Sequence, residues 1–154
     1  MRSGAQPRIA LALLFALAAC LALAACGGSS KKAAPQAPFV RQADAICAQG
    51  AALMRALPQA SGLARVAVVG RQGRAIIARY TARLEALRPP ASKAGEFNIY
   101  LSALRRELDN EDAIVAAARA HDKASVKSLQ AARTGYVRHS HDLGLRLGLA
   151  RCYG

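Results

Sequence analysis

Three histidines are candidate functional residues, because neutral imidazole is a common metal ligand. His139 and His141 are separated by one residue, and His121 lies upstream. On a helix, residues two apart point about 200° apart, whereas helical metal sites use spacings of three or four. No Glu-x-x-His or His-Glu-x-x-His motif occurs. We therefore expect surface histidines and no bound metal.

A group of acidic residues in the middle of the chain is the second candidate. Glu107, Asp109, Glu111 and Asp112 lie close together, but the glycine and glutamate spacing of a calcium loop is missing. Glu107 and Glu111 share one helix face, and this face suggests no pocket in which paired carboxylates would act as acid and base. We expect these acids to form exposed ion pairs with arginines of the preceding helix.

Other motifs of enzymes are also missing from the sequence. There is no Gly-x-Ser-x-Gly nucleophile motif, and neither the P-loop nor the dinucleotide-binding glycine pattern occurs. The chain has no tryptophan, which weakens the case for a sugar-binding platform. We predict no catalytic residues, no cofactor and no enzymatic activity.

The most specific chemistry belongs to a cysteine near the start of the chain. The run Leu-Ala-Ala-Cys that ends at Cys26 closes an apolar segment, and a Gly-Gly-Ser-Ser-Lys-Lys run follows it. Arg2 and Arg8 supply the positive region of an export signal, and residues 9–23 supply its apolar region. The run resembles the lipobox of bacterial lipoproteins, in which the cysteine receives a diacylglyceryl group, typically with palmitate, and becomes the mature N-terminus. The resemblance implies a signal peptide over residues 1–25 and a lipid anchor on the extracytoplasmic face of the cell membrane.

Two alternatives remain open in this region. Cys20 ends an identical Leu-Ala-Ala-Cys run, but more apolar chain follows it, so we prefer Cys26 as the modified residue. The leader could also be retained as a signal anchor, although its apolar run is shorter than the roughly 20 residues of a membrane span. Residues 26–37 are polar and carry glycine, serine and proline, which predicts a lipidated, flexible tether.

Helical periodicity dominates residues 38–154, which we predict to form a single domain. Apolar residues recur there at steps of three and four, and most prolines fall between the periodic stretches. Four amphipathic segments with short connections predict an all-α domain, an up-down-up-down four-helix bundle. The expected helices span residues 38–57, 61–87, 92–120 and 122–148.

Specific residues should set the ends of these helices. Ser61 and Asp122 are the expected N-caps of the second and fourth helices, and Gly148 is the expected C-cap of the last. A break in the third helix near Asn110 is an open alternative, because acidic residues cluster around it.

Two cysteines remain once Cys26 is lipidated and Cys20 is removed with the leader. Disulfides are common in exported chains, and the bundle topology places the start of the first helix beside the end of the last. We therefore expect a disulfide between Cys47 and Cys152. The alternative is two reduced cysteines, with Cys47 an ordinary core thiol.

The two ends of the domain also carry a recognisable pattern. Ala43 and Asp44 precede Cys47 in an Ala-Asp-x-x-Cys run, and Gly148 precedes Cys152 in a Gly-x-x-x-Cys run. The chain is similar in this respect to small helical lipoproteins and secreted proteins of high-GC Gram-positive bacteria. The resemblance implies a disulfide-clasped helical domain of unassigned activity, and it brings no catalytic residues.

The chain is strongly basic, with a formal net charge of +13 at neutral pH. Inside a cell this charge would suggest nucleic acid, but for an exported protein the available anions are lipid head groups and envelope polymers, so we expect no nucleic-acid partner. The second helix is the most basic element. The candidate anion-binding residues are Arg71, Arg74, Arg79 and Arg83. Ordinary solvated helix faces are the alternative interpretation.

Three functional hypotheses follow. The first is a non-catalytic envelope lipoprotein, a membrane-tethered helical module that binds a protein or envelope partner or has a structural role. The second is anion binding through the arginines of the second helix. The third is a carrier that holds a small molecule or metal in the interior of the bundle.

Overall fold

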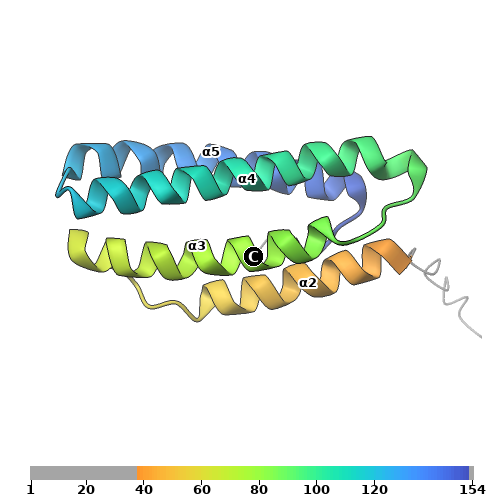
Figure 1. Ribbon diagram of the computed structural model, residues 1–154, viewed down its shortest axis with the longest axis horizontal. Coiled ribbons are helices and arrows are strands. Elements are labelled where there is room, and N and C mark those ends of the chain that lie inside the picture. Colours follow the sequence, from red (N-terminus) through yellow and green to blue (C-terminus); the bar gives the residue numbers. More distant parts are fainter. Residues whose placement is uncertain (1–37, 153–154) are drawn as a thin grey trace, which may run out of the picture. The chain divides into compact units, whose positions relative to one another are not determined.

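The computed structural model describes residues 38–152 of the chain as four helices (Figure 1). The helices are α2 (Pro38–Arg55), α3 (Leu63–Glu85), α4 (Ala91–Arg119) and α5 (Lys123–Leu147). The expected signal peptide, the lipid site at Cys26 and the tether over residues 26–37 lie outside the described residues. Within the described range there is no strand, so the predicted all-α class is confirmed.

The helices pack in chain order, α2 on α3, α3 on α4 and α4 on α5, and neighbours run antiparallel (Figure 1). This arrangement confirms the up-down-up-down bundle. None of the helices over residues 38–152 combines the length and hydrophobicity needed to cross a membrane.

The helix caps agree with the sequence at Asp122 and Gly148 and differ at Ser61. Asp122 caps α5 as expected, since its Oδ1 accepts a hydrogen bond from the Ser125 N–H at 3.0 Å. The Ser61 cap is wrong: α3 begins at Leu63, and Gly62 holds the N-cap position with a φ of 78°, which glycine adopts most readily. The open question at Asn110 is also answered, because α4 continues through it without a break.

The chain after α5 turns back toward α2 and is fastened there. Gly148 adopts the expected left-handed conformation, with a φ of 82°, and the Leu149 N–H donates to the Gly144 carbonyl at 2.9 Å. This turn buries Leu149 completely. It also brings Cys152 to Cys47, and the two form a disulfide with a Cα–Cα distance of 4.6 Å.

Asp44 completes this fastening, which we call the clasp: the Cys47–Cys152 disulfide, Asp44 and the Gly148 turn. The Oδ1 atom of Asp44 accepts a hydrogen bond from the Arg151 N–H at 2.9 Å. Asp44 is buried, although the sequence pattern places it beside the apolar stripe rather than on it. The clasp therefore joins the two ends of the domain. It consists of Asp44 and Cys47 from α2 and of Gly148 and Cys152 from the C-terminal segment.

The hydrophobic core is densest at the clasp end. Phe39, Phe97, Tyr100 and Leu147 are all buried there, and the rings of Phe39 and Phe97 meet edge to face with centroids 5.0 Å apart. A smaller cluster of Ala67, Ala118 and Val126 lies apart from it. The main core therefore holds the end of the domain where the first and last helices join.

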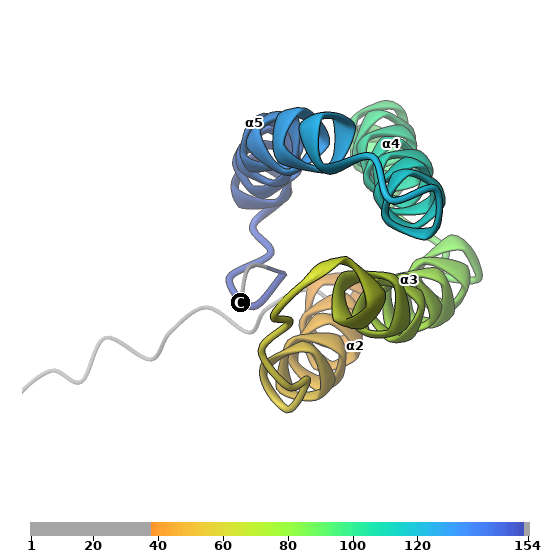
Figure 2. The ribbon, with the colours of Figure 1, turned by 90° about the vertical axis from the view of Figure 1, so that its left-hand side faces the viewer.

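The bundle is open along the side between α2 and α5. Every residue from 130 to 139 of α5 is exposed, because α2 does not cover this part of the helix. The end view shows α5 set apart from α2, with the C-terminal segment running from the end of α5 toward α2 (Figure 2). The sequence did not predict this opening, since its periodicity treats α5 as an ordinary bundle helix.

Removal of the clasp disulfide should destabilise the domain. The cysteines are 105 residues apart, and the chain-entropy model gives a loop of that length about 4–5 kcal/mol. We expect the Cys47→Ser/Cys152→Ser double variant to lose free energy of unfolding of this order in chemical denaturation of the full-length protein. Reduction should reproduce the loss in the wild type and leave the double variant unchanged. Free thiols at both positions in the unreduced protein, detected by intact mass, would contradict the clasp.

Candidate functional site

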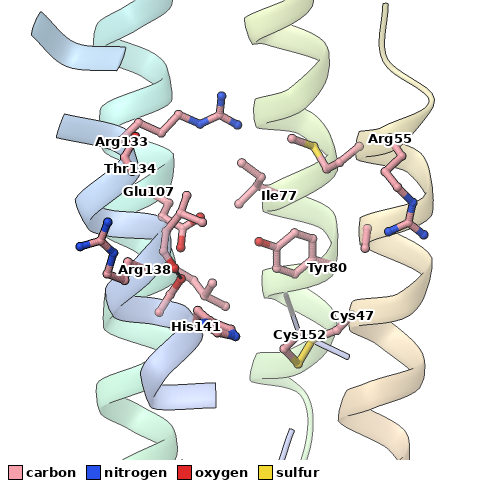
Figure 3. A pocket seen from close by; sticks show the side chains of 15 residues that line it. Cys47, Arg55, Ile77, Tyr80, Glu107, Arg133, Thr134, Arg138, His141 and Cys152 are labelled. Atoms are coloured by element: carbon pink, nitrogen blue, oxygen red, sulfur yellow. Dashed lines mark hydrogen bonds between the residues drawn. A yellow bond between two sulfur atoms is a disulfide. The ribbon is translucent and has the colours of Figure 1, made fainter. Parts of the chain in front are cut away.

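A cleft lies on the open side of the bundle, between α2 and α5 (Figure 3). Its volume is about 740 Å³, which is within the range of small-molecule sites. All four helices line it, and the clasp disulfide lies at one end. Apolar side chains provide most of the lining surface; they include Met54 of α2, Ile77 of α3, Leu104 of α4 and Val137 of α5.

Tyr80 projects into the cleft from α3. A Cβ atom at Gly50 of α2 would lie 2.7 Å from the Cδ1 atom of Tyr80, so only glycine lets the ring lie against α2 in this position. The hydroxyl group points toward the α4 and α5 side of the cleft (Figure 3). Burial raises the pKa of the Tyr80 phenol, and the nearby charge of Glu107 raises it further. Tyr80 is therefore a neutral hydrogen-bonding group at physiological pH.

Glu107 of α4 lines the cleft opposite Tyr80 (Figure 3). The residue is only 8% exposed, and its Oε1 atom has no hydrogen-bond partner among the described residues. Burial raises the pKa of the Glu107 carboxyl, while the nearby Ser140 hydroxyl and the charge of Arg133 partly oppose the rise. An acid that is buried and incompletely paired is costly to keep ionised, which is why the pKa of Glu107 lies above its usual range.

Arg133 of α5, whose charge acts on Glu107, is already paired with another acid. Its Nε atom lies 2.7 Å from Oε1 of Glu111, and the Glu111 side chain is only 6% exposed. A second pocket of about 260 Å³ shares Met54 and Arg133 with the first, so the Arg133–Glu111 pair lies where the two pockets adjoin. Glu107 therefore faces a cleft in which Arg133 is already paired with another acid.

The acidic group is thus divided between two environments. Asp112 pairs with Arg74 of α3 at 2.9 Å, which confirms the expected exposed ion pair. The same expectation is wrong for Glu111, which is buried and pairs with α5. We also predicted no pocket at the helix face of Glu107 and Glu111, and this prediction is wrong because Glu107 lines the cleft. The missed signal is spacing, because Glu107 and Glu111 continue the stripe of Tyr100 and Leu104 at steps of three and four.

The histidines are separated by the structure as their spacing predicts. His139 is exposed, whereas His141 is half-buried and lines the cleft. His121 lies in the turn between α4 and α5, with a φ of 56°. Over residues 38–152, no three His, Cys, Asp or Glu side chains lie close enough together to hold a metal ion.

The four candidate arginines of α3 do not form one surface. Arg74 pairs with α4, whereas Arg83 donates a hydrogen bond to Gln49 of α2, on the opposite flank of α3. Arg71 and Arg79 are exposed. Two of the four side chains are therefore engaged in holding α3 to its neighbours.

Comparison of the chain with protein-family models, with curated proteins and with solved structures finds no match. The cleft is therefore interpreted from the chemistry of its own residues.

The buried acids predict a stability that falls as pH rises. The ordinary pKa of a glutamate is 4.5, and burial raises the pKa of both Glu107 and Glu111 in the folded protein. The folded state therefore binds these protons more tightly than the unfolded state. The resulting stabilisation is fully present below the ordinary pKa and is lost as pH rises through the folded-state pKa.

As pH rises from about 5 to about 8, the free energy of unfolding should fall less in the Glu107→Gln variant than in the wild type, because glutamine does not ionise. Chemical denaturation across this range measures the difference. Asp109→Asn, which neutralises an exposed acid on the same helix, should follow the wild-type curve. A Glu107→Gln curve parallel to that of the wild type would contradict the raised pKa.

Proposed function

We propose that residues 38–152 form a non-catalytic binding module that holds an amphipathic small molecule in the α2–α5 cleft. The observation that carries the proposal is a ligand-sized, mainly apolar cleft in which a buried carboxyl oxygen lacks a partner among the described residues. Buried polar atoms are almost always hydrogen-bonded in folded proteins. A ligand with an apolar body and one polar group matches both the apolar lining and the Glu107 carboxyl.

Binding suits the polar residues of the cleft better than catalysis does. The Ser140 hydroxyl donates to the Val137 carbonyl of its own helix at 3.0 Å, which is not the geometry of an activated nucleophile. Cys47 and Cys152 are joined in the clasp, so neither thiol is available to react. Anion binding by α3 receives less support, because Arg74 and Arg83 are engaged on opposite flanks of the helix.

We further propose that a diacylglyceryl group on Cys26 tethers this module to the extracytoplasmic face of the cell membrane. The proposal rests on the resemblance of the run before Cys26 to a lipobox and on the polar residues that follow it. Two acyl chains give stable anchoring, whereas one chain gives only marginal binding. A tethered carrier of this kind meets amphipathic molecules at the membrane surface, where they are concentrated.

Cys26→Ala should abolish metabolic labelling with palmitate and release the protein from the membrane fraction or mislocalise it, because the acceptor thiol is removed. Cys20→Ala is the matched control and should remain labelled and membrane-bound. Labelling that persists in Cys26→Ala and disappears in Cys20→Ala would overturn the choice of site.

The cleft itself can be probed in the native envelope with a photoreactive amino acid. Placed at Val137, which is 43% exposed and lines the cleft, benzoylphenylalanine should give an adduct of small, defined mass on illumination of the full-length protein. The matched control is Val68 of α3, which is 39% exposed and lines neither of the two pockets described here. An equal yield of the same adduct at both positions, or adducts to proteins alone, would contradict a small-molecule site.

A further inference from the structure

We propose that the cleft is specific for an amphipathic amine, whose protonated primary amino group pairs with Glu107 while its apolar part lies along Ile77, Leu104 and Val137. This inference rests on the proposed binding function and specifies its ligand class. The shared chemistry is a primary ammonium on an apolar body, whether a free alkylamine or the amino head group of a membrane lipid.

The charge balance around Glu107 favours a cationic ligand. The groups of α4 near it are Tyr100 and Glu111, and those of α3 and α5 are Tyr80, Arg133, Ser140 and His141. Arg133 is the cation that acts on Glu107, and Glu111 already neutralises it at 2.7 Å. A ligand cation would therefore meet a carboxylate that has no ion pair with any of the residues 38–152.

The hydrogen-bond acceptors of the site also suit an ammonium group. An alkylammonium has three N–H donors and no acceptor. The Glu107 carboxyl, which lines the cleft, accepts one of them. The hydroxyl oxygen of Tyr80, directed to the same part of the cleft, accepts a second (Figure 3), and the third donor faces water on the open side. A carboxylate ligand would instead place a second acid beside Glu107.

Two arginines at the edge of the cleft would favour an anionic ligand. Arg55 of α2 and Arg138 of α5 also line the cleft, and both are exposed. The Arg138 side chain points away from the cleft in Figure 3. Water and salt screen charges in such positions, whereas a buried ion pair is screened much less. The contact with Glu107 therefore determines which charge the site prefers.

Binding also changes the protonation of the site in a defined way. Where the Glu107 carboxyl is protonated, an incoming ammonium ion displaces that proton to solvent, and the carboxylate that remains pairs with the ligand. No bond other than this O–H bond is broken. The affinity for an amine should therefore rise with pH through the titration of Glu107, up to the pH at which the amine itself loses its charge.

Three probes of equal chain length test the proposal: octylamine, octanol and octanoate. Each is titrated calorimetrically into the full-length protein in phosphatidylcholine nanodiscs, and empty nanodiscs correct for partition into lipid. We expect octylamine to bind most tightly and to lose about tenfold or more in affinity in Glu107→Gln, because the buried ion pair is removed. Octanol should bind more weakly and equally to both proteins. Asp109→Asn, which makes the same charge change on an exposed residue, should bind octylamine as the wild type does.

Tyr80→Phe provides a second variant that removes only one hydroxyl, and it should weaken octylamine several-fold while leaving octanol unchanged. If phosphatidylethanolamine vesicles compete with octylamine for the cleft, the natural ligand is the amino head group of a lipid. If octylamine binds selectively and the vesicles do not compete, the natural ligand is a free amine. Octylamine affinity that is equal in the wild type and Glu107→Gln, or tightest binding of octanoate, would overturn the amine proposal while leaving a binding cleft. Failure of all three probes to bind beyond the empty nanodiscs would overturn the proposed function as well.

Discussion

The clasp between α2 and the C-terminal segment is the constraint on which the open cleft depends. The first and last helices share little packing along their length, so the Cys47–Cys152 disulfide and the Asp44 hydrogen bond join them at one end. If α2 and α5 packed along their full length, they would bury the apolar residues that now line the cleft. Such a bundle would depend less on a covalent link for its stability. The disulfide allows this seam to remain open in a small domain whose main core lies at the clasp end.

The open seam explains why a carboxylic acid can occupy the interior of the domain. Glu107 lies on the stripe of α4 that faces the bundle, where an apolar residue would otherwise pack. The neighbouring Glu111 forms an ion pair with Arg133, whereas no ion pair of Glu107 is found among the described residues. Such a residue costs stability, and proteins commonly accept that cost at binding sites. Gly50 and Tyr80 fit the same interpretation, since the glycine lets a neutral hydroxyl reach the cleft.

Much of the fold could be predicted from the sequence, because helical periodicity and end signals are local properties. The four helices, the Asp122 and Gly148 caps and the Cys47–Cys152 pair follow from spacing and chain order. The Ser61 cap failed because Gly62, with its positive φ, took the capping position. The cleft could not be predicted, since periodicity identifies which face of a helix is buried and not whether two non-consecutive helices meet. Glu107 was misplaced for a related reason: charge suggested exposure, whereas this acid is buried in the assembled bundle.

The ionisation of Glu107 tests the central claim most directly. Carbon-13 NMR of the labelled side-chain carboxyl, assigned by its loss in Glu107→Gln, reports its pKa in the full-length protein with and without octylamine. The structure predicts a pKa above the ordinary glutamate value in the free protein and a lower pKa when the amine is bound, because the ligand stabilises the charged form. An ordinary pKa that octylamine does not change would contradict the account.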